Sequence, residues 1–267
     1  MKINVICIGN LKEEFMKDAA SEYLKRINRF IKINVIELKE ERLKEENNIK
    51  EINGGVVFDF GASTPQLTSK ERGFSFMSEA KLDMRFNQEA DFSAYDVIND
   101  YKEDELVRIF SEYGEERFSK RIAKKIVETR RIKRIETTKD LVDIIFEATP
   151  RIKSRIHPAT RVFQAIRIEV NHELDNIKNT LNEVLTLLSN DAILSIVTFH
   201  SLEDRIVKQF FKHYSKEWVG EQGVFDYNEP LLQLINKKPI VASEEEVRIN
   251  PPSRSAKLRI ARRINKK

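Results

Sequence analysis

Glycine is scarce in this sequence, with 8 among 267 residues, whereas roughly 7% is typical of proteins. Loops that cradle nucleotide cofactors usually need two or three closely spaced glycines, because the backbone must approach phosphate or ribose closely. Neither G-x-G-x-x-G nor G-x-x-x-x-G-K-[ST] can be written with the glycines present. The shortage therefore excludes these two common phosphate-binding motifs.

Cysteine and long apolar runs are also lacking. Cys7 is the only cysteine, which excludes an intramolecular disulfide and a cysteine zinc site. The four histidines are scattered without metal-ligand spacing, so we predict no metal ligands. The longest strongly apolar stretch, residues 192–199, is far shorter than the ~20 residues of a membrane span, and the first residues do not resemble a signal peptide. We expect a cytoplasmic protein in a reducing compartment, with no membrane partner.

Positive charge is concentrated although the net charge is only +4. Residues 117–134 carry nine basic side chains and one acid, and residues 248–267 carry eight basic side chains and no acid. Such clusters are either solvated faces or surfaces that attract a phosphate backbone. The candidate RNA-binding residues are Arg117, Lys120, Arg121, Lys124, Lys125, Arg254, Lys257 and Arg259.

The first 52 residues predict a short β-α-β segment. Apolar residues alternate from Ile3 to Cys7 and recur at Ile33 to Leu38, which is typical of strands. Between them, residues 11–30 carry apolar side chains about four apart, which predicts an amphipathic helix. The almost wholly polar stretch from residue 39 to residue 51 marks a boundary, as a solvated helix or linker.

The rest of the chain predicts an α/β fold. The apolar run of residues 54–60 suits a buried parallel strand, and residues 92–188 are helical with few exceptions, with Thr138 as a candidate N-cap and Pro158 opening a helix. Residues 192–199 form the clearest strand, and the Ser201–Asp204 spacing predicts a capping box for the next helix. After Tyr214 the chain reads as irregular until a last strand at residues 257–261.

Two residues lie where ligands bind in α/β proteins, beyond the carboxyl ends of predicted strands. Asp59 ends the strand of residues 54–60, where a carboxylate is able to pair with a cation, although a turn-capping role explains it equally well. His200 follows the strand of residues 192–199 and is a weak catalytic candidate; the alternative is a turn histidine that bonds to the backbone. Gln66 is uninformative on its own.

Longer strings resemble one known family. Residues 57–85 (VFDFGASTPQLTSKERGFSFMSEAKLDMR), 112–130, 157–174, 199–211 and 237–263 are similar, in order, to blocks of the small-subunit ribosomal RNA cytidine N4-methyltransferases, the methyltransferase H or MraW family. The resemblance implies an S-adenosylmethionine-dependent enzyme that methylates the N4 amine of a cytidine in the decoding region. It also implies that Asp59 and Gln66 contact the cofactor, and that small-subunit ribosomal RNA or the small ribosomal subunit is the partner.

The family's Gly-Gly-His cofactor loop has no counterpart in residues 1–52, which instead resemble the start of the large-subunit rRNA pseudouridine N3-methyltransferases of the SPOUT class. We therefore expect a chimera or a truncated enzyme. The expected fold is a partial Rossmann-like methyltransferase sheet (residues 53–90 and 160–267) with an RNA-binding helical insertion (residues 91–159). Two alternatives remain: an RNA-binding remnant that lacks the cofactor, and a large-subunit pseudouridine methyltransferase.

Overall fold

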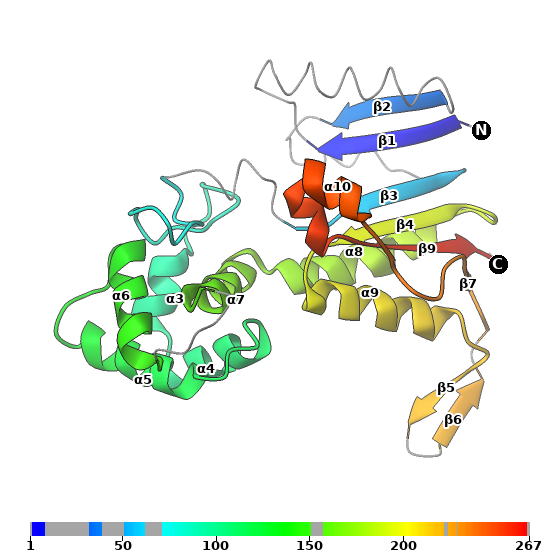
Figure 1. Cartoon of the computed structure of the whole chain (residues 1–267). Coiled ribbons are helices and arrows are strands. Elements are labelled where there is room, and N and C mark those ends of the chain that lie inside the picture. The colour runs from blue at the N-terminus through cyan, green and yellow to red at the C-terminus, as the bar shows by residue number, and fades with distance from the viewer. Residues whose placement is uncertain are drawn as a thin grey trace. The chain divides into compact units, whose positions relative to one another are not determined.

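The computed structural model describes residues 2–8, 32–38, 51–61, 71–150, 157–221, 224–227 and 229–265. Gln66 and the helix predicted for residues 11–30 lie outside these ranges. The chain divides into two compact units, one of residues 1–60 with 177–267 and the other of residues 61–176. We refer to them as the sheet unit and the helical unit (Figure 1), and describe each by itself.

A five-stranded mixed sheet organises the sheet unit. β3 and β4 are parallel, with Asp59 opposite Val197, and the C-terminal β9 runs antiparallel to β4. β7 and β8 both pair with β9. The strands predicted at residues 54–60, 192–199 and 257–261 are thereby confirmed. The first of them, β3, is half-buried, whereas the sequence predicted a buried strand. The strands are β3 (Gly55–Asp59), β4 (Ile193–Thr198), β7 (Leu232–Leu234), β8 (Ile240–Val241) and β9 (Lys257–Arg263).

Two further strand pairs belong to the same unit. β1 (Lys2–Ile8) and β2 (Lys32–Leu38) pair in parallel, as the alternating pattern predicted. β1 lies beside β3 (Figure 1), although the two strands are in separate hydrogen-bonded sheets. The expectation of irregular chain after Tyr214 is wrong, because β5 (Trp218–Glu221) and β6 (Val224–Tyr227) form an antiparallel pair there.

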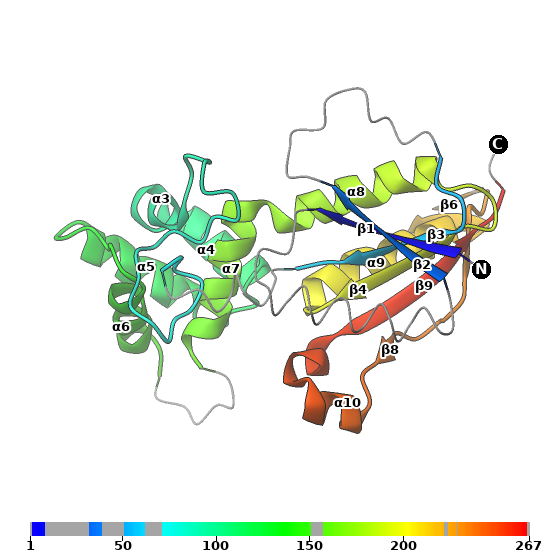
Figure 2. The ribbon, with the colours of Figure 1, turned by 90° about the horizontal axis from the view of Figure 1, so that it is seen from above.

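Two long helices supply the apolar core of the sheet unit. α8 (Glu173–Leu187) and α9 (Ser201–Tyr214) run along the strand direction (Figure 2). β4 buries alternate side chains, and its Leu194 and Ile196 pack in one cluster with apolar residues of both helices. This alternation is what a strand with one covered face requires. Helix α10 (Glu244–Ile249) and the 3-10 helix η2 (Pro251–Ser255) precede β9.

The helical unit has its own core and is larger than the insertion predicted at residues 91–159. Phe74, Leu82 and Met84, which precede that range, are buried among the helices, and so are Val162 and Ile166, which follow it. Burial of these apolar side chains holds both flanking segments to the helices. The helices are α3 (Ala94–Asp100), α4 (Glu103–Glu112), α5 (Ser119–Arg130), α6 (Thr138–Ala148) and α7 (Ala159–Asn171).

Two helix starts illustrate how local signals act in this unit. Pro158 is the N-cap of α7, close to the predicted start. The N-cap of α6 is Thr137 rather than Thr138: the Thr137 hydroxyl accepts a hydrogen bond from the Asp140 N–H, and the Asp140 carboxylate returns to Thr137. Thr138 is fully buried instead, and its hydroxyl donates to the Ser78 carbonyl.

Candidate functional site

The carboxyl ends of β3 and β4 lie side by side and form the candidate site. Asp59 is the last residue of β3, and the Phe60 N–H that follows donates to the Val197 carbonyl at 3.1 Å. The Asp59 residue is exposed. Partial burial of its carboxyl nevertheless raises its pKa, and the negative charge of Glu203 raises it further. The predicted strand-end position of Asp59 is therefore observed, next to a second carboxylate.

That second carboxylate comes from the turn between β4 and α9. His200 is the N-cap of α9, with extended backbone, and Glu203 is the third residue of the helix. Glu203 Oε2 accepts hydrogen bonds from the N–H groups of Phe199 (2.7 Å) and His200 (3.2 Å). The capping box is thus His200 with Glu203, and the predicted pairing of Ser201 with Asp204 is wrong.

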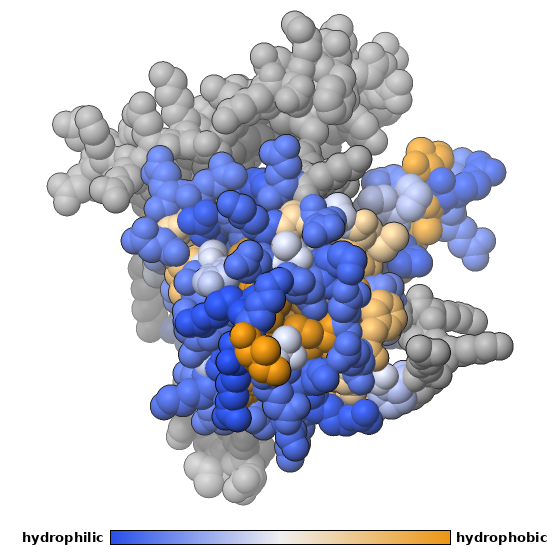
Figure 3. Space-filling view, turned by 90° about the vertical axis from the view of Figure 1, so that its left-hand side faces the viewer, coloured by the Kyte–Doolittle hydropathy of each residue, from blue (hydrophilic) through white to orange (hydrophobic). Residues whose placement is uncertain are grey.

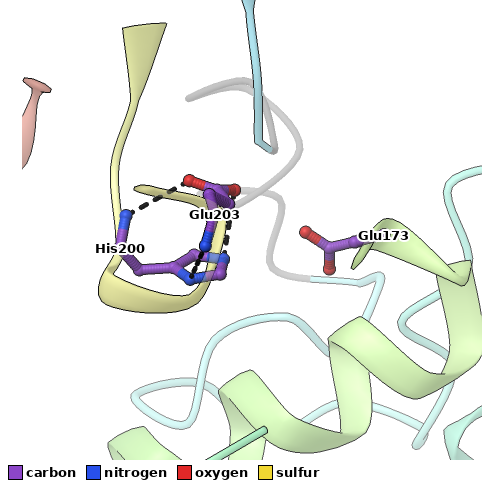
Figure 4. A group of neighbouring side chains, drawn as sticks. All are labelled: Glu173, His200 and Glu203. Carbon is purple, nitrogen blue, oxygen red and sulfur yellow. Dashed lines mark hydrogen bonds and ion pairs between the residues drawn. The ribbon is translucent and has the colours of Figure 1, made fainter. Parts of the chain in front are cut away.

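Glu203 is a fully buried anion. Burial alone would raise its pKa, but hydrogen bonding from the His200 side chain, the charge of that imidazole and the two backbone N–H groups outweigh this effect and lower it. Its Oε1 lies 3.1 Å from His200 Nε2 (Figure 4). Glu173, the third residue drawn there, belongs to the helical unit, where Arg167 donates to it at 2.7 Å.

Asp204, the next residue of α9, is neutralised by β9. Arg259 donates to it through Nε at 2.7 Å and through a second nitrogen at 3.1 Å, and Lys257 Nζ lies 3.5 Å away. These cations lower the pKa of Asp204 in spite of its partial burial, which acts in the opposite direction. The guanidinium of Arg259 is buried and occupied by this pair, so the prediction that it contacts RNA phosphate loses its physical basis. Arg254 is exposed.

A cavity of about 310 Å³ adjoins the end of β4 within the sheet unit. Val197, whose Cα faces that of Asp59, is part of its lining. The polar side chains of the lining are Ser243, Glu246 and Ser253. Glu246 is exposed, so its carboxylate is accessible from solvent. Sequence reasoning missed both Glu203 and Glu246, because neither ends a strand.

The basic face predicted in the helical unit lies mainly on α5. Lys120, Arg121 and Lys124 are exposed on the side of the helix opposite the buried Ile122 and its neighbours, and Arg117 is exposed just before the helix. Figure 3 shows a largely hydrophilic face on this unit. Lys125 is half-buried and pairs with Glu147 at 2.9 Å, so its charge is already partly compensated.

Two other arginines of the same basic run are structural. Arg130 donates to the carbonyls of Ile98 and Tyr101, at the end of α3. Arg134 donates to the Asn99 carbonyl and the Asp100 carboxylate, both at 2.7 Å. Arg130 and Arg134 thereby hold the turn after α5 against the end of α3. Between them, Arg131 and Lys133 are exposed.

The described residues do not test every prediction made from the sequence. Gln66 lies outside the described residues, and its predicted cofactor contact remains a prediction, as does the absence of metal ligands. None of the helices that the structure describes combines the length and the apolar character that a membrane span needs.

Comparison with known proteins gives consistent matches along nearly the whole chain. The model of the MraW methylase family matches residues 4–264. The chain is 45% identical over 265 residues to a protein named Ribosomal RNA small subunit methyltransferase H from Sulfurihydrogenibium sp. (strain YO3AOP1), a match that covers 98% of this chain and 86% of that protein. It is 48% identical over 254 residues to the protein of the same name from Clostridioides difficile (strain 630), which covers 93% of this chain and 80% of the relative.

These matches bear on the first 52 residues. Because the family match begins at residue 4, it includes the segment for which the sequence predicted a separate, SPOUT-class origin. No comparison supports that origin, or the chimera inferred from it.

Proposed function

Because the chain belongs to the MraW methylase family, we propose that it methylates small-subunit ribosomal RNA in the cytoplasm, with S-adenosylmethionine as the methyl donor. The acceptor is the N4 amine of a cytidine in the decoding region. The observation that carries this proposal is the match to a methylase family over residues 4–264, joined to an anionic site at the carboxyl ends of β3 and β4.

The residues at the strand ends fit the charge of the proposed cofactor. S-adenosylmethionine supplies an electrophilic methyl group on a sulfonium, and it also carries an ammonium. Asp59 is exposed at the end of β3, and the buried Glu203 adds a second negative charge beside it. A carboxylate attracts a nearby cation most strongly where water is partly excluded. Asp59 is therefore the residue that we assign to holding the cofactor, with Gln66 as its predicted partner.

The acceptor amine needs alignment more than activation. The N4 lone pair is delocalised into the cytosine ring, so this amine is a weak nucleophile, and holding it in line with the methyl group supplies much of the rate. The cavity beside Val197 offers the Glu246 carboxylate, and a carboxylate is the usual protein acceptor for a cytosine amine. We assign Glu246 to orienting the base, which must leave its stack to enter such a site.

The exposed cations of the helical unit are suited to RNA phosphates. Lys120, Arg121 and Lys124 share the exposed side of α5, and Arg117 is exposed just before this helix. Phosphate contacts position an RNA without reading its sequence. We expect the affinity for a small-subunit rRNA fragment to fall steeply as the salt concentration rises. In the double variant Lys120→Ala, Lys124→Ala, the slope of the logarithm of affinity against the logarithm of salt concentration should decrease by the equivalent of about one or two phosphate contacts. Lys139→Ala, an exposed lysine of α6 paired with Asp143, is the control. A wild-type affinity that does not respond to salt would contradict this role.

A second candidate function is RNA binding without catalysis. The sequence favours it at one point, since Gly54-Gly55 is followed by Val56 and no Gly-Gly-His occurs in the chain. Isothermal titration calorimetry with S-adenosylmethionine separates the two functions. We expect binding by the wild type, at least a tenfold loss in Asp59→Asn, and no change in Glu245→Gln, an exposed carboxylate of α10. Absence of heat at millimolar ligand would favour the binding protein.

A further inference from the structure

Glu203 carries a negative charge that solvent water does not reach and therefore does not screen. Its side chain has an exposed fraction of 0%, while hydrogen bonding keeps its pKa below the ordinary value in spite of burial. Its position in the first turn of α9 adds the favourable field of the helix N-terminus. The carboxylate is therefore ionised at neutral pH, and its field extends through a region of low dielectric.

Glu203 is held only by its own turn, without a lysine or arginine in ion-pair contact. Oε2 receives the two backbone N–H groups of Phe199 and His200. The neighbour of Oε1 is the His200 imidazole, whose Nε2 lies 3.1 Å away (Figure 4). A fully buried carboxylate whose partners include no lysine or arginine is costly to keep ionised, which points to a functional requirement.

Glu203 lies close to the strand end where Asp59 stands, because it accepts from the Phe199 N–H, two residues after Val197, which pairs with Asp59. Its negative charge accordingly contributes, after partial burial, to the raised pKa of Asp59. The other carboxylate of the turn does not compete with it. Asp204 is held by Arg259 at 2.7 Å and by Lys257 at 3.5 Å, which compensates its charge locally. Among the described residues of this turn, Glu203 is thus the carboxylate without a lysine or arginine in ion-pair contact, and its neighbour is His200.

Methyl transfer changes the charge of the cofactor at one atom. The bond from carbon to the sulfonium breaks, its electron pair stays on sulfur, and S-adenosylhomocysteine with a neutral thioether remains. The acceptor nitrogen forms the new bond to carbon and releases one proton to solvent. A fixed anion attracts the sulfonium and gains nothing from the thioether, and fixed groups of this kind do not reorganise during the reaction.

We propose that Glu203 is the fixed charge that makes this site bind S-adenosylmethionine in preference to S-adenosylhomocysteine, so that the spent product leaves. The inference rests on the proposed function and adds to it a residue that determines donor specificity. Asp59 cannot supply the same discrimination alone, because it is exposed and water and salt screen its charge. Glu203 is not a catalytic residue in this account, because its buried carboxylate acts through its field.

Glu203→Gln tests the proposal with little change in shape. The glutamine carbonyl is still able to accept from Phe199 and His200, so the capping of α9 is kept while the charge is removed. The affinities of the wild type, Glu203→Gln and the control Glu245→Gln for both ligands are measured by calorimetry. We expect the preference for S-adenosylmethionine over S-adenosylhomocysteine to fall about tenfold in Glu203→Gln and to stay unchanged in Glu245→Gln.

The outcomes distinguish an effect of the Glu203 charge from a purely structural role of this residue. If Glu203→Gln weakens both ligands equally, or neither, the preference is unchanged and the proposal is overturned. If the wild type binds neither ligand, the proposed function itself fails and this inference fails with it. His200→Asn is the second variant; it retains a good N-cap residue and removes the imidazole beside Oε1, while the two backbone N–H groups still hold the Glu203 carboxylate. It should keep the wild-type preference, and a loss of preference there would also overturn the proposal.

Discussion

The pairing of Arg259 with Asp204 leads to a quantitative prediction about stability. In Arg259→Met the side chain keeps its length but loses its charge, and Asp204 is left with Lys257 at 3.5 Å. Removing one member of a buried ion pair typically costs 3–5 kcal/mol, mostly because the other charge stays buried. The side chains of Arg259 and Asp204 are 9% and 13% exposed, and Lys257 remains, so we expect about 2–3 kcal/mol.

Urea unfolding of the sheet unit measures this loss. Far-ultraviolet circular dichroism follows the unfolding, since α8 and α9 belong largely to this unit. We expect a lower midpoint with an unchanged slope. The matched control is Arg254→Met, because Arg254 is exposed and its replacement should change the stability by no more than about 0.5 kcal/mol. Equal stability of the two variants, with weaker RNA binding by Arg259→Met, would show that Arg259 contacts phosphate instead.

Three further predictions follow from other parts of the molecule. Glu246→Gln should raise the KM for RNA several-fold while leaving the calorimetric affinity for S-adenosylmethionine unchanged, because Glu246 is assigned to the acceptor base; equal weakening of both would contradict that assignment. Gly114→Ala should destabilise the helical unit by about 2 kcal/mol in thermal unfolding, since an added Cβ would lie 2.7 Å from the carbonyl oxygens of Phe110 and Arg161; unchanged stability would mean that the backbone moves easily. Asp204 has a lowered pKa, so its stabilisation is present above its ordinary value of 3.8 and is lost as the pH falls through its lower, folded-state pKa; Asp204→Asn should remove this part of the acid transition, and an unaltered acid transition would exclude it.

Local patterns in the sequence predicted most of the regular structure. The apolar runs at residues 54–60 and 192–199 both predicted strands that the structure confirms, because a short apolar run bounded by turn residues is a strong and local signal. The β5–β6 pair was missed because its strands are only four residues long. The extent of the helical unit was missed because Phe74 and Met84 are buried in its core without belonging to any helix.

The site was predictable only in part. Asp59 stands at a strand end, which is a position that the chain pattern reveals, and the structure places it there. The partners of charged side chains are not local: Arg259 lies 55 residues from Asp204, so its role in an ion pair could not be read from a cluster of basic residues. Glu203 was overlooked because Ser201 and Asp204 offered an equally regular capping pattern, and the backbone of His200 decides between them.

The most direct test of the central claim is the identity of the methylated nucleoside. The purified chain is incubated with small ribosomal subunits from cells that lack this methyltransferase and with S-adenosylmethionine labelled in the methyl group. The RNA is then digested to nucleosides and separated, with large subunits and the Asp59→Asn variant in parallel. The account predicts label in N4-methylcytidine from the small subunit and little with the variant. Label in a pseudouridine of the large subunit, or in no nucleoside although S-adenosylmethionine binds, would contradict it.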